Sequence, residues 1–158
     1  MLKYVDTMVV CSDVPDEITL AINISNCCIH CKGCHSPYLW EDIGIELTES
    51  ILNKLIKEND GITCVCIMGG DAFPAEVNKA LVLIEKQGLK SAWYSGKQGI
   101  AKEVDLGNLD YLKLGPYVEK LGGLINKTTN QVMYKITHDK NGITMKNITS
   151  KFWEKLNS

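Results

Sequence analysis

The sequence lacks the marks of a secreted or membrane-embedded protein. Its N-terminus has no basic segment followed by an apolar run, which a signal peptide would show, and the short apolar run at residues 8–10 is bounded by Asp6 and Asp13. No apolar stretch approaches the roughly 20 residues that cross a bilayer. Neither sign of charge dominates, with 17 basic and 19 acidic side chains. Neither nucleic acid nor a membrane is therefore indicated as a partner.

A disulfide framework is also missing. The chain has seven cysteines, an odd number, and four of them lie between residues 27 and 34. Such crowding favours thiol chemistry in a reducing cytosol, so we expect a cytoplasmic protein. The length of 158 residues suits one domain with a real core, and no linker or repeat divides it. We therefore expect a single domain over residues 1–158.

Strand and helix patterns alternate from residue 17 to residue 114. Apolar runs predict strands at residues 18–24, 63–68, 89–94 and 111–114. Helices are predicted to follow Thr48, a suitable N-cap, and to begin near Pro74 and stop at Gly88, with a short helix at residues 100–104. Strands that are apolar on both faces and separated by helices favour parallel pairing.

The chain is too short for a closed eight-stranded α/β barrel, which takes roughly 250 residues. We therefore predict an α/β fold that forms a partial, open parallel β/α barrel. After residue 115 the pattern changes, and alternating residues 132–137 and 143–148 predict a β-hairpin around the turn at residues 139–142. A short amphipathic helix with Phe152, Trp153 and Leu156 is expected to close the chain.

Three cysteines carry the strongest chemical signal. Cys27, Cys31 and Cys34 have the spacing C-x3-C-x2-C within one short loop directly after the first predicted strand. Iron–sulfur clusters and zinc both take thiolate ligands. A cluster of four irons normally takes four cysteines, so a loop that supplies three would leave one iron open to a ligand from outside the protein.

A structural zinc site is the main alternative for this loop, and incidental free thiols are another. Cys28, His30 or His35 could complete a zinc set, but structural zinc usually takes a second ligand pair some distance along the chain. Cys64 and Cys66 are too close together for such a pair and lie in a predicted buried strand. They are expected to pack in the core, as is the isolated Cys11, whereas Cys28 is interpreted as structural.

Two other segments follow predicted strands at the same edge as the cysteine loop. In Gly69-Gly70-Asp71, the glycines would let the backbone approach a ligand and Asp71 could bind an ammonium group. In Ser95-Gly96, the Ser95 hydroxyl could bind a ribose or a carboxylate. Both segments could equally be plain turns, in which glycine supplies a positive φ and serine a cap. Their shared position favours one site.

These motifs together resemble the radical S-adenosylmethionine (SAM) superfamily. Further segments are similar to the activating proteins of anaerobic ribonucleoside-triphosphate reductases. They are Cys-Lys-Gly-Cys-His-Ser-Pro-Tyr-Leu-Trp, Gly-Gly-Asp, Trp-Tyr-Ser-Gly, and the tract from Tyr-Leu-Lys-Leu-Gly-Pro-Tyr to Thr-Thr-Asn-Gln. The similarity covers most of the chain from about residue 18. One departure is Ala72-Phe73, where those proteins usually show Pro-Leu.

The resemblance implies a partial barrel of the radical SAM type and a [4Fe–4S] cluster held by Cys27, Cys31 and Cys34. It implies that the open iron binds the amino and carboxylate groups of SAM. The cofactor-binding residues that it implies are Gly33, Cys34, His35, Gly69, Gly70, Asp71 and Ser95, with Asp71 at the ammonium group. No acid–base catalytic side chain is implied, because reductive cleavage of SAM yields a 5′-deoxyadenosyl radical.

The implied partners are the large reductase subunit, on which a glycyl radical is generated, and a one-electron donor such as flavodoxin. We also predict that residues 115–131 form part of the surface that docks the reductase, with a plain surface loop as the alternative. Two other functions stay open. One is a radical enzyme that acts on a small molecule or on another glycyl radical enzyme. The other is a non-catalytic zinc or iron–sulfur binding module.

Overall fold

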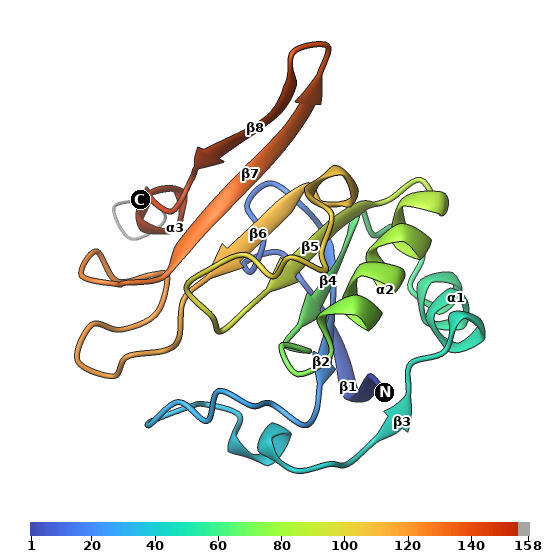
Figure 1. The fold of residues 1–158 in the computed structure, drawn as a ribbon, viewed down its shortest axis with the longest axis horizontal. Coiled ribbons are helices and arrows are strands. Elements are labelled where there is room, and N and C mark those ends of the chain that lie inside the picture. The colour runs from blue at the N-terminus through green and yellow to red at the C-terminus, as the bar shows by residue number, and fades with distance from the viewer. Residues whose placement is uncertain (155–158) are drawn as a thin grey trace.

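An open, mixed β-sheet of eight strands forms the centre of the computed structural model, which describes residues 1–154 (Figure 1). The spatial order of the strands is β3-β1-β2-β4-β5-β6-β7-β8. The strands are β1 (Lys3–Val10), β2 (Thr19–Ile24), β3 (Ile45–Glu46), β4 (Cys64–Met68), β5 (Lys90–Tyr94), β6 (Tyr111–Leu114), β7 (Val132–Asp139) and β8 (Gly142–Asn147). The helices are α1 (Glu49–Glu58), α2 (Pro74–Lys86) and α3 (Lys151–Glu154), with 3₁₀ turns η1 (Pro37–Trp40) and η2 (Leu106–Asn108).

The four central strands β2, β4, β5 and β6 run parallel, which confirms the predicted pairing. Their register places Asn23, Met68, Tyr94 and Lys113 in one row across the sheet, close to the carboxyl end of each strand. The loops that follow these strands therefore leave the sheet at one edge. That edge receives the cysteine loop after β2, Gly69-Gly70-Asp71 after β4 and Ser95-Gly96 after β5.

Helices α1 and α2 cover one face of the sheet, and the larger core lies beneath them (Figure 1). Thr48 caps α1 as predicted, because its Oγ1 accepts a hydrogen bond from the N–H of Ile51 at 3.2 Å. Gly88 follows α2 with a φ of +76°, in the left-handed region that commonly ends helices. The core combines aliphatic residues of both helices with the sheet residues Leu20, Ile22, Ile24, Val65, Ile67, Trp93, Leu112 and Leu114.

The opposite face of the sheet is covered by loops and by α3. Its smaller core includes Cys64 and Cys66, which are fully buried as predicted, together with Tyr111 and Met133. Phe152 of α3 packs into the same core, and Leu156 lies outside the described residues. The β7–β8 hairpin forms the side of the sheet opposite β3 and projects from the rest of the molecule, as Figure 1 shows. Two residues, Lys140 and Asn141, connect its strands.

Three predictions differ from the structure. The first strand, β1, was not predicted, and it pairs antiparallel with β2. Residues 100–104 do not form the predicted helix; they form turns that lead to η2, which Asp105 caps through the N–H of Gly107. Cys11 is exposed, because it follows β1 in a surface turn, so its predicted place in the core is wrong.

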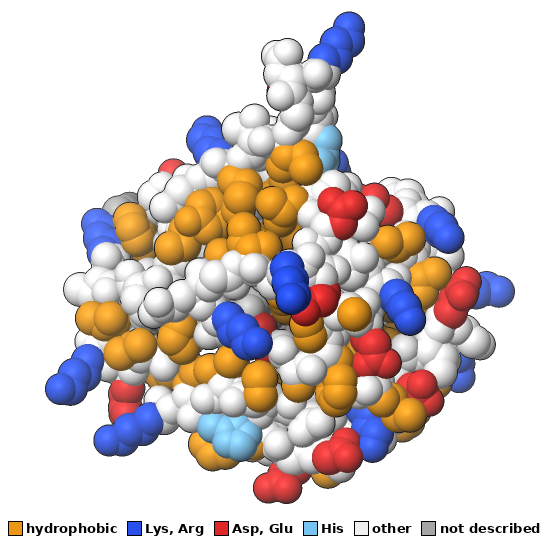
Figure 2. Space-filling model, in the orientation of Figure 1, with side chains coloured by type: hydrophobic (Ala, Val, Ile, Leu, Met, Phe, Trp, Pro, Cys, Tyr) orange, Lys and Arg blue, Asp and Glu red, His pale blue; other side chains and the backbone are white. Residues whose placement is uncertain are grey.

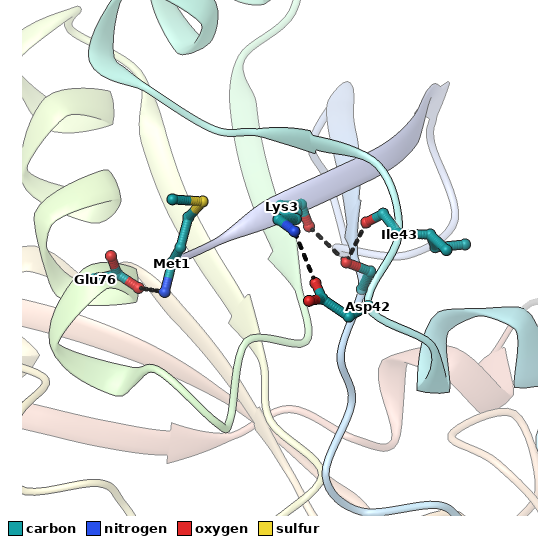
Figure 3. A network of polar contacts seen from close by, with 6 residues as sticks. Met1, Lys3, Asp42, Ile43 and Glu76 are labelled. Atoms are coloured by element: carbon teal, nitrogen blue, oxygen red, sulfur yellow. Dashed lines mark hydrogen bonds and ion pairs between the residues drawn. The ribbon is translucent and has the colours of Figure 1, made fainter.

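The segment after the cysteine loop is tied back to the start of the chain (Figure 3). The Ser25 hydroxyl donates a hydrogen bond to the carbonyl of Ile43 at 2.6 Å, and the Lys3 ammonium pairs with Asp42 at 3.0 Å. The N-terminal amino group of Met1 pairs with Glu76 of α2 at 2.8 Å. The contacts of Ser25 and Asp42 fix the two ends of the segment that carries the cysteines. None of the helices within residues 1–154 is long and apolar enough to cross a membrane.

Candidate metal centre

The loop that carries the three cysteines leaves the sheet at the end of β2 and returns through η1. Backbone hydrogen bonds from Asn26 to Glu41 and from Cys27 to Leu39, both 2.9 Å, close its base. A third, from Cys34 to Cys31 at 3.1 Å, folds its tip. Asn26, His30 and Gly33 have positive φ values of 60°, 52° and 78°. Non-glycine residues adopt such values infrequently, so this loop has a specific and unusual backbone path.

Cys27, Cys31 and Cys34 are partly buried free thiols on this loop. The N–H of Tyr117 donates to Sγ of Cys31 at 3.3 Å, and the N–H of Ser36 donates to Sγ of Cys34 at 3.4 Å. The three sulfurs are not drawn together: among residues 1–154, no three metal-ligating side chains are close enough to hold a single metal ion. Cys28, interpreted from the sequence as structural, has an exposed side chain.

Asp71 and Ser95, predicted to share a site, are hydrogen-bonded to each other. The Ser95 hydroxyl donates to Oδ1 of Asp71 at 2.5 Å, and the N–H of Gly96 donates to Oδ2 at 2.9 Å. Both side chains are buried, with Asp71 4% exposed. A buried carboxylate needs such donors, because burial without partners disfavours its charge. The carboxylate is thus held by two hydrogen bonds from the segment that follows β5.

Gly69 and Gly70 bring the backbone close to this carboxylate. Gly70 has a φ of +90°, and a Cβ added there would lie 2.7 Å from Val77 of α2, so the position requires glycine. The indole N–H of Trp93 donates to the carbonyl of Gly69 at 2.7 Å, which ties this turn to β5. The two glycines thus form the positive-φ turn that the sequence allowed as the plain alternative, and their place beside a ligand stays a prediction.

The cysteine loop touches both of its neighbours at the edge. Ile29 packs on Gly96 so closely that a Cβ on this glycine would lie 2.8 Å from its side chain. Gly33 faces the side chain of Glu119, and the exposed His35 ring lies against Tyr117, with ring centroids 5.3 Å apart. The predicted site segments are therefore brought together, and the tract after β6 joins them.

A cavity of about 480 Å³ opens beside the cysteine loop. Its lining includes Cys34 and His35 from the loop, Met68, Tyr94 and Lys113 from the sheet row described above, and Gln131, which directly precedes β7. Another hollow, of about 410 Å³, lies between β3, α1 and α2 and contains none of the cysteines. The first cavity is the one placed for chemistry at the thiols.

Residues 18–97, slightly more than half of the chain, match the family model of the 4Fe–4S single cluster domain. The chain belongs to this family. The matched region contains the three-cysteine loop, the Gly69-Gly70-Asp71 turn and Ser95. Comparison with curated proteins and with solved structures finds no significant match. The protein is therefore an iron–sulfur protein, as the cysteine spacing predicted.

Although the three sulfurs are not drawn together, the chemistry of the donor set fits a [4Fe–4S] cluster in this iron–sulfur domain. Cys27, Cys31 and Cys34 supply the soft thiolates that such clusters take, and none of them is in a disulfide. Two of the sulfurs already accept backbone N–H groups, an arrangement that stabilises negative charge on sulfur. Gly33 leaves the loop close to Glu119, where a Cβ would lie 3.1 Å from the carboxyl group. The loop that carries the thiols is thus packed closely against Glu119 at Gly33.

Sequence reasoning missed two residues, Lys113 and Tyr94, that line the cavity beside the cysteine loop. Lys113 is 8% exposed, and its Nζ donates to the carbonyls of Ser95 at 3.1 Å and Gly115 at 2.8 Å. Burial lowers the pKa of Lys113 to about 8, and the nearby Asp71 offsets part of that effect. The Tyr94 hydroxyl donates to the carbonyl of Asp13, and burial raises the pKa of Tyr94 well above its usual range. The sequence did offer a signal for Lys113, because it is a lysine within an otherwise apolar predicted strand.

Proposed function

We propose that this iron–sulfur protein is a radical SAM activase that generates a glycyl radical on an anaerobic ribonucleoside-triphosphate reductase. We infer with it that the open sheet is a partial β/α barrel of the radical SAM type. The observation that carries the proposal is the meeting of the three-cysteine loop with the Asp71–Ser95 pair at one edge of the parallel strands. A cluster that takes three protein thiolates leaves an iron for an exogenous ligand, and the cavity adjoins that loop.

Each part of the edge has a task under this proposal. Cys27, Cys31 and Cys34 would hold the cluster, and together with SAM the bound cluster would supply one-electron reductive cleavage of a carbon–sulfur bond. The buried Asp71 carboxylate, kept in place by Ser95 and Gly96, would bind the ammonium group of SAM. The bare backbone at Gly69 and Gly70 would let the cofactor lie close to β4.

A macromolecular substrate suits the open sheet. In the proposed reaction the protein positions the reacting groups and transfers no proton, so no catalytic acid or base is assigned. The tract at residues 115–131 borders the cavity and contacts the cysteine loop through Tyr117, so docking of the reductase there would place its glycine near the site. The electron would come from a one-electron donor such as flavodoxin.

Low-temperature electron paramagnetic resonance tests the cofactor part of the proposal. The protein is reconstituted with iron and sulfide under anaerobic conditions, reduced, and measured with and without SAM. We expect a [4Fe–4S]⁺ signal that changes shape when SAM is added, and 5′-deoxyadenosine as a product. A cluster signal that is indifferent to SAM, or stoichiometric zinc in place of iron, would leave a non-catalytic binding module.

A matched pair of variants ties that response to Asp71. Asp71→Asn keeps the shape of the side chain and removes the charge proposed to bind the ammonium group, so the affinity for SAM should fall at least tenfold. Asp105→Asn makes the same change at an exposed carboxylate that caps η2, and SAM binding should stay at the wild-type level. Equal SAM affinity in the wild type and Asp71→Asn would remove Asp71 from the proposed site.

The partner is tested by adding the large reductase subunit to the reduced, SAM-treated protein. The expected result is a stable organic radical signal on the reductase. Substitution of Tyr117 and Asn130 together should reduce radical formation on the reductase while SAM cleavage without the partner is preserved. If radical formation is unchanged, residues 115–131 form a plain surface loop.

A further inference from the structure

Lys113 is a buried cation that forms no direct ion pair among the described residues. It lies in β6, in the sheet row that faces the cavity, and only 8% of the residue is exposed. Lysine is almost never buried to this degree unless it is paired. Among residues 1–154, no ion pair within 4 Å includes Lys113; its hydrogen-bond partners are two neutral carbonyls. The charge therefore calls for an explanation beyond local pairing.

Those two carbonyls fix where the ammonium group sits. Ser95 follows β5 and Gly115 follows β6, so Nζ bridges the ends of two neighbouring parallel strands. The ring of Tyr94 lies on its other side, with the centroid 5.6 Å from Nζ. An ammonium group has three N–H donors, and the two carbonyls occupy two of them. The cation is thus held at a defined point on the wall of the cavity.

Most of the groups that act on the charge of Lys113 lie at the edge of the sheet that carries the cysteine loop. Burial lowers the pKa of Lys113, and electrostatic attraction to Asp71, Cys31, Cys66 and Cys27 opposes that effect. Cys31 and Cys27 are on the loop and Asp71 follows β4 at the same edge, whereas Cys66 packs in the smaller core. Cys34, on the same loop, lines the cavity that Lys113 also lines. Cluster-bound cysteines are thiolates, so loading the site adds negative charge where this cation already stands.

We propose that Lys113 is the counter-charge of the iron–sulfur site, a fixed cation that stabilises the reduced cluster and thereby raises its midpoint potential. Reduction adds one negative charge to the cluster. A cation held in a poorly solvated position nearby attracts that charge strongly, because little water screens it. Net charge and solvent exposure are two of the factors that set cluster potentials. The inference rests on the cluster and is independent of SAM.

A lysine that merely clamps Ser95 to Gly115 is the alternative, and three substitutions separate the two roles. Lys113→Met removes the charge and the hydrogen-bond donors. Lys113→Gln removes the charge but keeps an N–H donor for the carbonyls, and Lys113→Arg keeps both. Lys97→Met removes the charge of an exposed lysine that also acts on the cysteine loop, at Cys28, and it serves as the matched control for a charge that solvent screens.

The measurement is the midpoint potential of the reconstituted cluster in the full chain, by a redox titration without SAM, with the iron content of each variant. For Lys113→Met and Lys113→Gln we expect the equilibrium constant for reduction to fall about tenfold, which is a shift of about 59 mV to a more negative potential for one electron. Lys113→Arg and Lys97→Met should stay close to the wild type.

Three outcomes would overturn the inference. In one, the potential is unchanged in both Lys113→Met and Lys113→Gln. In another, Lys113→Met shifts the potential while Lys113→Gln and Lys113→Arg both match the wild type, which would show a clamp. In the third, all three variants at position 113 fail to load iron. Because SAM is absent throughout, failure of this inference would not count against the proposed radical function, nor would a SAM-indifferent cluster count against the inference.

Discussion

The cysteines of the loop and the cysteines of β4 put the same side chain to opposite uses. Cys27, Cys31 and Cys34 are partly exposed on a loop with an unusual backbone path, and two of their sulfurs accept backbone N–H groups. Cys64 and Cys66 have no exposed surface, and they face the smaller core from the middle of the sheet. Cysteines in the loop at the carboxyl edge of the strands are thus candidate ligands, whereas cysteines within a central strand are packing residues.

The electrostatics of the buried pair reinforce this contrast. Burial raises the pKa of Cys64 to about 12 and raises the pKa of Cys66 well above its usual range. A thiol must lose its proton to bind iron, so these two are disfavoured as ligands by their surroundings as well as by access. Short spacing between cysteines is therefore insufficient to make a metal site. The chain must also present them where charge on sulfur is tolerated.

The largest effect should come from removing single cysteines of the loop. Cys27→Ser, Cys31→Ser and Cys34→Ser should each abolish stable cluster binding, because a cluster with two protein thiolates is weakly held. Iron content and the visible absorption of the reconstituted protein measure this. Cys28→Ser, in the same loop, is the matched control and should keep the cluster. If Cys28→Ser loses iron and Cys27→Ser retains it, Cys28 and not Cys27 is the cluster ligand.

A moderate effect is expected in β4. Cys66→Ser replaces a buried thiol by a hydroxyl of similar size in apolar surroundings, so the free energy of unfolding should fall by about 1–3 kcal/mol. Urea unfolding of the cluster-free protein measures it, with Cys11→Ser as an exposed control that should be nearly neutral. Iron content after reconstitution should match the wild type. A Cys66→Ser protein that folds normally but binds no iron would make β4 part of the metal site.

The contrast between the two sets also explains what the sequence could predict. The candidate ligands of the loop were recognisable because their spacing is local, and the pairing of β2, β4, β5 and β6 followed from apolar runs separated by helices. The meeting of Asp71 with Ser95 followed from the rule that parallel strands end at one edge. The buried place of Cys64 and Cys66 followed from an apolar strand. Each of these inferences depends on a pattern of residues that are close together in the sequence.

Other features depend on contacts between distant parts of the chain. β1 is mostly half-buried and mixes Lys3, Asp6 and Thr7 with apolar residues, so no clear alternation marks it as a strand. The hydrogen bond from Tyr117 to Cys31 spans 86 residues and has no local signature. Cys11 was placed in the core by residue type, although the turn after β1 leaves it in solvent. The radical SAM fold type and the reductase partner stay predictions.

The smallest expected effect is the contribution of the buried Lys113 ammonium group to the pH dependence of stability, which can be compared with that of the buried thiols. Lys113 has a folded pKa of about 8 against an ordinary value of 10.5, so above about pH 8 the unfolded chain binds a proton that the folded chain has released. Stability from this group therefore rises with pH, by at most about 1.4 kcal/mol per pH unit. From about pH 9 the raised pKa values of Cys64 and Cys66 act in the opposite direction.

The informative window is thus pH 7 to 9, in cluster-free protein. Lys113→Met lacks the ionisable group, so the difference in unfolding free energy, wild type minus variant, should grow by about 1 kcal/mol across that window. Urea unfolding of both proteins at several pH values measures it, and Lys97→Met should give a constant difference because its lysine is exposed. A difference that stays flat for Lys113→Met would mean that the ammonium group is well solvated. In that case its electrostatic influence on the cysteine loop would be weak.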